Sequence, residues 1–267
     1  MMRHLAALTA LALALPGVAL AQDDALARAA EVYRLAAWPA PGPARAGVAP
    51  AAVGAPGWVV DGQTVHPARG EATVRLVQPE TKAEVALSAR VLESPAAARA
   101  ALLRRLAAVQ RPLEPVAGVG EVAFGGAVGG RLVLLHAVRG NVLVEVRATE
   151  GRERVPAEAL RSIALALDAL VMAAPPVEPG QVAGPRLLGV RVAPARAGAP
   201  ARVALDLDPA GPPAAFVLFE SPDDVSVVEV DGGWELIAPA PGTVRLTVWA
   251  ASKLLWPTRA EVTVEVR

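Results

Sequence analysis

The chain has 267 residues, with 26 basic and 26 acidic side chains and no cysteine. Its hydrophobic fraction of 54%, of which little is aromatic, excludes intrinsic disorder because the chain has ample apolar surface to bury. The missing cysteine excludes a disulfide scaffold, a cysteine-ligated metal site and a cysteine nucleophile. The formal charge of zero argues against nucleic acid as a partner.

Residues 1–21 have the pattern of a secretory signal peptide. Arg3 and His4 form a short positive start, residues 5–15 are apolar, and Ala19-Leu20-Ala21 offers a small-x-small cleavage site. The apolar run is shorter than the ~20 residues that a membrane span needs. We therefore expect an exported protein, periplasmic or secreted, with no stable membrane insertion after signal cleavage.

Residues 22–57 predict an N-terminal helix and an irregular loop. Apolar residues recur at near-helical spacing over 23–37. Residues 39–57 hold many proline, glycine and alanine residues, which predict irregular structure.

Residues 58–171 predict an α+β domain. Its first part is a hairpin over 58–65, turning at Asp61-Gly62, and two more strands over 72–78 and 83–92. A helix then begins at Pro95 with Ser94 as its N-cap.

The second part of this region continues the same pattern. We expect a short strand over 118–124, a glycine-rich hairpin loop, and strands 131–138 and 142–148 around a turn at Gly140-Asn141. A closing helix begins near Pro156, with apolar residues on one face at Leu160, Ile163, Ala164, Leu167, Leu170 and Val171. The elements together predict an antiparallel sheet with flanking helices that cover one side.

Residues 172–185, rich in proline and glycine, predict a linker, and residues 186–267 predict an all-β, immunoglobulin-like sandwich. Seven short strands are expected at 186–193, 201–207, 214–219, 225–230, 234–238, 243–250 and 260–266.

Two stretches resemble known families. Residues 84–171, with the Ser94-Pro95 helix start, the Gly118–Ala123 stretch and the Arg139–Val144 turn, resemble exported bacterial domains of the sensor-domain and Mog1/PsbP-like kind. That resemblance implies a non-catalytic domain and carries over no catalytic residue. Residues 183–267 resemble a bacterial immunoglobulin-like domain, on the Ala240–Val248 stretch and the ending Val262–Val266.

The first candidate site is a histidine–carboxylate pair. A two-residue turn at Gly140-Asn141 sets His136 opposite Glu145 on neighbouring strands. A carboxylate at that distance is expected to raise the histidine pKa, as in a pH switch or a general base. The alternative is an ordinary cross-strand polar pair, which we favour because no nucleophile or metal-ligand cluster accompanies it.

The second candidate is the apolar loop Lys253–Pro257, which departs from the usual inter-strand loop of an immunoglobulin-like domain. Leu254, Leu255 and Trp256 in this loop predict an exposed interface for a partner.

Other polar patterns have plainer explanations. The glycine-rich stretch 124–130 lacks the lysine and the following helix of a phosphate loop. Acidic residues in 186–267 fit turns better than a calcium site, at Asp206, Asp208, Asp223, Asp224 and Asp231. Four arginines without interleaved aromatic residues fit a solvated helix surface, at Arg99, Arg104, Arg105 and Arg111. We expect no metal and no cofactor.

These observations favour an exported, non-catalytic binding or interaction protein of the bacterial cell envelope, with an envelope protein as its possible partner. The alternative is a small-molecule or lipid-binding protein, with its pocket between the sheet of residues 58–148 and its helices. An enzyme of unknown class is the third hypothesis.

Overall fold

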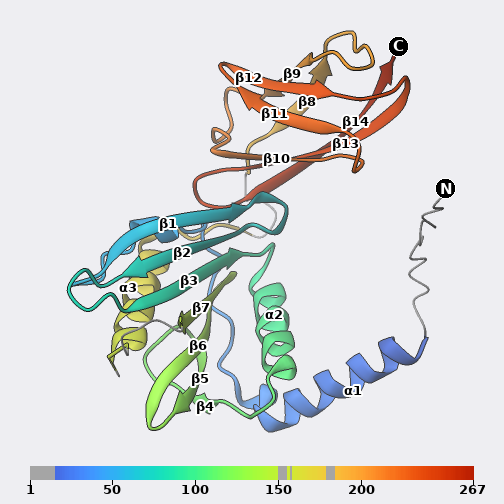
Figure 1. Ribbon diagram of the computed structural model, residues 1–267. Helices are drawn as coiled ribbons and strands as arrows, with labels where there is room; N and C mark the ends of the chain where they lie inside the picture. The colour runs from blue at the N-terminus through green and yellow to red at the C-terminus, as the bar shows by residue number, and fades with distance from the viewer. Residues whose placement is uncertain (1–15, 150–154, 157, 179–183) are drawn as a thin grey trace, which may run out of the picture.

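The computed structural model describes residues 16–149, 155–156, 158–178 and 184–267, which form three antiparallel sheets and three α-helices (Figure 1). Residues 1–15, the larger part of the expected signal peptide, lie outside the described residues. The expected cleavage site after Ala21 falls within the first helix, α1 (Pro16–Val32). Within the described ranges, no helix combines the length and the apolar character that a membrane crossing requires.

The first part of the chain builds one seven-stranded sheet in the order β1-β2-β3-β7-β6-β5-β4. All of its neighbouring strands are antiparallel. The strands are β1 (Val59–His66), β2 (Glu71–Val77), β3 (Glu84–Val91), β4 (Glu114–Pro115), β5 (Val122–Val128), β6 (Arg131–Arg139) and β7 (Val142–Ala148).

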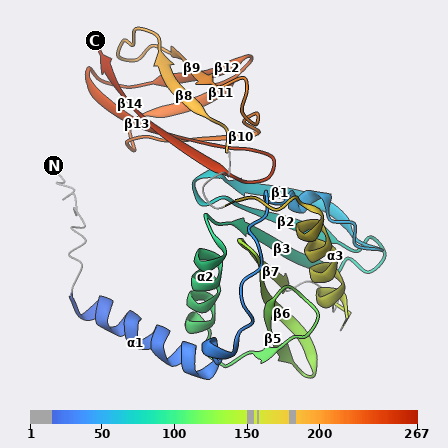
Figure 2. The ribbon, with the colours of Figure 1, turned by 180° about the vertical axis from the view of Figure 1, so that it is seen from behind.

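Helices pack on both faces of this sheet, so the expectation of a single covered side is wrong. Helix α3 (Ala159–Ala173) shares a core with one face, and α2 (Pro95–Ala108) shares a separate core with the other, while α1 packs on α2 (Figure 2). The physical reason lies in the central strands, where consecutive residues such as Val142, Leu143 and Val144 are all buried. A strand with apolar residues on both faces needs cover on both.

Two predicted turns differ in the structure. Asp61-Gly62 is not a hairpin turn: β1 runs on through it as one edge strand, and the register against β2 shifts between Val60 and Gly62. The extra residue forms a bulge because both halves of the strand pair with β2. The glycine-rich loop is also shorter than expected, since β5 extends to Val128 and only Gly129-Gly130 turn, both with positive φ.

The start of α2 follows the prediction, because the Ser94 side chain accepts a hydrogen bond from the Ala97 amide (3.1 Å). Ser94→Ala leaves this amide without its side-chain partner, and we expect it to lower the free energy of unfolding by about 1 kcal/mol. Ser94→Asp, which keeps an acceptor at the N-cap, is the matched control and should stay close to the parent protein in chemical denaturation. Equal losses in the two variants would contradict the capping role.

The irregular segment 39–57 has little regular structure, as predicted, apart from the short helix η2 (Pro50–Ala52). Some of its apolar residues are nevertheless buried, and Val48, Val53 and Ala55 belong to the core on the α3 side of the sheet. The chain after α3 runs beside it, with Arg45 bridged to Pro176. The segment therefore contributes to the core of the sheet it crosses.

The last part of the chain forms seven strands close to the predicted ranges. They make a three-stranded sheet, β10-β13-β14, and a four-stranded sheet, β11-β12-β9-β8, which share one apolar core. The strands are β8 (Leu187–Val192), β9 (Ala201–Leu207), β10 (Phe216–Glu220), β11 (Ser226–Val230), β12 (Gly233–Ile237), β13 (Gly242–Ala251) and β14 (Pro257–Val266).

Candidate functional site

The register predicted around Gly140-Asn141 is confirmed: His136 lies opposite Glu145. The histidine Nδ1 is 3.5 Å from Glu145 Oε2, and the imidazole is buried, with 4% of the residue exposed. Both residues point to the α2 side of the sheet, because Val138 and Leu143, each two residues away along its own strand, belong to the core beneath α2. Nδ1 has no hydrogen-bond partner of good geometry among the described atoms.

The expected direction of the histidine pKa is wrong. Burial lowers the pKa of His136 below its ordinary value of 6.5, more than the Glu145 carboxylate raises it, and the nearby Arg105 guanidinium lowers it further. The sequence places the carboxylate opposite the histidine but does not reveal that α2 covers both. The neutral imidazole is therefore the form that the fold favours.

This pKa shift makes stability depend on pH. The unfolded chain takes up a proton near pH 6.5, before the folded chain does, so stability is full above about pH 6.5 and falls as the pH drops below it. The slope reaches at most about 1.4 kcal/mol per pH unit for one proton. We expect His136→Gln to flatten this slope in denaturation series between pH 7.5 and 5.5. An unaltered slope in the His136 variant would refute the assignment.

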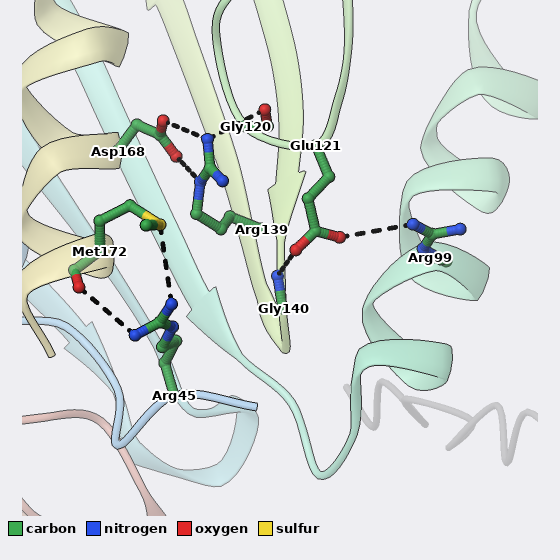
Figure 3. A network of polar contacts seen from close by, with 8 residues as sticks. All are labelled: Arg45, Arg99, Gly120, Glu121, Arg139, Gly140, Asp168 and Met172. Carbon is green, nitrogen blue, oxygen red and sulfur yellow. Dashed lines mark hydrogen bonds and ion pairs between the residues drawn. The ribbon is translucent and has the colours of Figure 1, made fainter. Parts of the chain in front are cut away.

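A second polar cluster surrounds the β6–β7 turn and was not predicted (Figure 3). Arg139 Nε donates to Asp168 Oδ1 (2.5 Å), while its Nη2 donates to Asp168 Oδ2 (2.8 Å) and to the Gly120 carbonyl (3.0 Å). This two-point hydrogen bonding raises the pKa of the Arg139 guanidinium. One signal was present in the sequence: Asp168 is a carboxylate on the otherwise apolar face of α3.

Glu121 continues the cluster toward α2. Its Oε1 accepts a hydrogen bond from the Gly140 amide (2.9 Å), and its Oε2 lies 3.4 Å from Arg99 Nη2. Arg99 is therefore largely buried and paired, which corrects its assignment to a solvated surface. With Arg139 and Asp168, these contacts tie both helices to one end of the sheet, so the cluster has a sufficient structural role.

Asn141 completes this arrangement from inside the turn. It is fully buried, its Oδ1 accepts a hydrogen bond from the Arg45 amide (2.6 Å), and its Nδ2 donates to the Leu92 carbonyl (3.0 Å). The Arg45 guanidinium in turn donates to the Met172 and Ala174 carbonyls at the end of α3. The turn residue therefore fixes the irregular segment against the sheet.

The apolar loop is not the exposed surface that the sequence predicts. Leu255 is 0% exposed and Trp256 is 8% exposed, and both belong to the core beneath α3, formed mainly by the first part of the chain. Trp256 Nε1 donates a hydrogen bond to the Ala46 carbonyl (2.7 Å). Of the three apolar residues predicted to form the interface, Leu254 is the one that remains substantially exposed. The apolar character of the loop thus reflects a contact between two parts of the same chain.

The remaining candidates keep ordinary roles. Asp206 pairs with Arg191 and Asp208 pairs with Arg186 (2.5 and 3.5 Å). Within the ranges that the structure describes, no three His, Asp or Glu side chains gather as metal ligands would.

A cleft of about 440 Å³ lies between the two parts of the chain. It is lined by Gln63, Val65 and Pro67 on one side and by residues 214–218 and the pair Glu229 and Trp234 on the other. Figures 1 and 2 show the sheet of β10, β13 and β14 lying over β1, the edge strand of the large sheet, and the short helix η3 (Pro67–Arg69) that follows β1 contacts all three of those strands. The cleft therefore lies away from the space between the sheet and its helices, where the small-ligand alternative placed a pocket.

Sequence reasoning missed this cleft, because its lining comes from ranges of the chain that are about 150 residues apart in the sequence. It contains none of the five predicted site residues, which are His136, Glu145, Leu254, Leu255 and Trp256.

No protein-family model matches the chain, and no curated protein is similar enough to count as a relative.

Proposed function

We propose that this chain is an exported, non-catalytic binding protein of the bacterial cell envelope, and that it binds its partner in the cleft between β1 and β10. In this proposal residues 58–171 act as an α+β domain and residues 186–267 as an immunoglobulin-like domain. The observation that carries the proposal is the cleft itself, which is lined by two strands that each end a sheet.

The composition of the cleft supports binding. Most of its lining residues are apolar, backbone and side-chain polar groups are exposed beside them, and Leu218 is 39% exposed on β10. Sites of this kind combine apolar surface with a few polar groups that orient the ligand, and here Gln63 and Glu229 supply them.

The contact around Trp256 supports a cleft of stable shape. Leu255 and Trp256, from the last part of the chain, are packed into the core beneath α3. The short helix η3 (Pro67–Arg69) contacts β10, β13 and β14. Because these contacts hold both walls, little ordering is needed when a partner binds, which favours affinity.

The test is site-specific photo-cross-linking with the tagged full chain in its cells. A benzoylphenylalanine in place of Leu218 is expected to capture a reproducible protein partner. The matched control is the same replacement at Leu188, which is more exposed but lies on β8, outside the cleft.

Equal labelling at the two positions, or none at Leu218, would contradict the proposal. The cleft volume also lies in the range of small-molecule sites, about 300–1,000 Å³. Recovery of a small molecule on the Leu218 probe, without any protein, would favour that second candidate.

A further inference from the structure

We infer that the cleft accepts an extended segment of a partner protein, which adds as a fourth strand to the free edge of β10 and places a basic side chain beside Glu229. This inference rests on the proposed function and names the kind of partner. Strand addition of this type uses the main chain for affinity and alternate side chains for specificity.

The two C-terminal sheets have unequal numbers of strands. The three-stranded sheet faces a four-stranded one: Phe219 of β10 packs on Trp234 of β12, with ring centroids 5.6 Å apart, and β14 contacts β8. With β10 opposite β12 and β14 opposite β8, no strand of the described chain lies opposite β11. A strand added at the edge of β10 would occupy that place.

The inner face of β11 is incompletely covered. Val227 and Glu229 are paired with Leu236 and Trp234 of β12, so their side chains point to the same inner side as those two residues. Leu236 is buried, whereas Glu229 is exposed. An added strand would cover this uncovered end of the inner face.

The cleft beside β10 has a second wall, which β1 provides. Because Phe219 points inward, Leu218 points outward, toward the side where Gln63 and Val65 of β1 line the cleft. Side chains that alternate along an added strand would meet β11 and β12 on one side and β1 on the other. This geometry suits an extended segment better than a helix.

Charge selects among extended segments. Glu229 is the one charged side chain among the described residues that line the cleft. A lysine or arginine on the inner side of the added strand would pair with it, whereas an acidic residue would be repelled. An inward-pointing charge at a sheet edge also discourages unselective strand pairing, so Glu229 would reject strands that lack the basic residue.

The test uses two ten-residue peptides of alternating valine and threonine, one with a central lysine and the other with a central glutamate. We expect the lysine peptide to bind the full chain roughly tenfold more tightly, as expected for one attractive pair replaced by a repulsive one. Hydrogen exchange should slow at the β10 amides that point away from β13, which lie on alternate residues between Phe216 and Glu220. Glu229→Lys should reverse the preference, while Asp224→Lys, an equal charge change on an exposed residue outside the cleft, should preserve it.

Equal affinities for the two peptides, or binding without slower exchange at the free-edge amides of β10, would overturn the inference. Its failure is distinguishable from that of the proposed function. A protein captured at Leu218 in cells, in a complex that leaves the free-edge amides of β10 unprotected, refutes strand addition alone. The absence of any cross-linked protein at position 218 in cells refutes the proposed binding function as well.

Discussion

Leu255→Ala is expected to lower the free energy of unfolding by about 2–5 kcal/mol, the range for removing most of a buried leucine side chain from a packed core. Leu255 is completely buried and contacts the core beneath α3, although it belongs to a loop between β13 and β14. Its φ of 69° is left-handed, and alanine does not relieve that conformation. The loss therefore comes from the cavity and the apolar contacts.

The neighbouring Leu254→Ala is the matched control. Leu254 is 38% exposed, so the same chemical change should cost well under about 1 kcal/mol. Chemical denaturation of the full chain, followed by tryptophan fluorescence, measures both variants. Comparable losses at 254 and 255 would show that Leu255 is not packed as described. A lower denaturant concentration at the midpoint of the whole unfolding transition of Leu255→Ala would show that the loop stabilises the core beneath α3.

Asp168→Ala is expected to cost about 2–4 kcal/mol, a little less than the loss of one partner from a fully buried ion pair. The side chains of Arg139 and Asp168 are 22% and 12% exposed, so solvent screens the unpaired arginine only in part. The variant leaves a guanidinium at the base of the β6–β7 turn, with the Gly120 carbonyl as its remaining acceptor among the residues that the structure describes. Helix α3 also loses its polar attachment to the sheet.

A double-mutant cycle separates this pair from general damage to the core. The cycle compares Arg139→Leu, Asp168→Leu and the double variant that carries both changes and so removes both charges. We expect the double variant to lose less free energy of unfolding than the sum of the losses in these two single variants. Asp206→Ala, which removes an exposed carboxylate paired with Arg191, is the matched control and should change stability by less than about 1 kcal/mol. Strict additivity in the cycle would contradict a direct Arg139–Asp168 interaction.

Local sequence patterns predicted several elements well. The Ser94-Pro95 start of α2, the Gly140-Asn141 turn and the His136–Glu145 register depend on residues close together in sequence, and all three are confirmed. The seven C-terminal strands follow from alternation and turn residues in the same way. The Asp61-Gly62 turn failed because the same two residues also suit a bulge, and pairing of both halves of the strand with β2 decides between them.

The sequence by itself predicted most of the helices and strands, because capping, alternation and turn chemistry act over a few residues, although β1 and β5 run through residues that were predicted as turns. Only the tertiary structure decided what each side chain faces. Burial under α2 reversed the expected direction of the His136 pKa shift. Leu255, which the sequence predicts at the surface, lies in the core beneath α3. The cleft beside β10 joins ranges about 150 residues apart. Burial and long-range contacts of this kind depend on how whole elements pack, which no local pattern encodes.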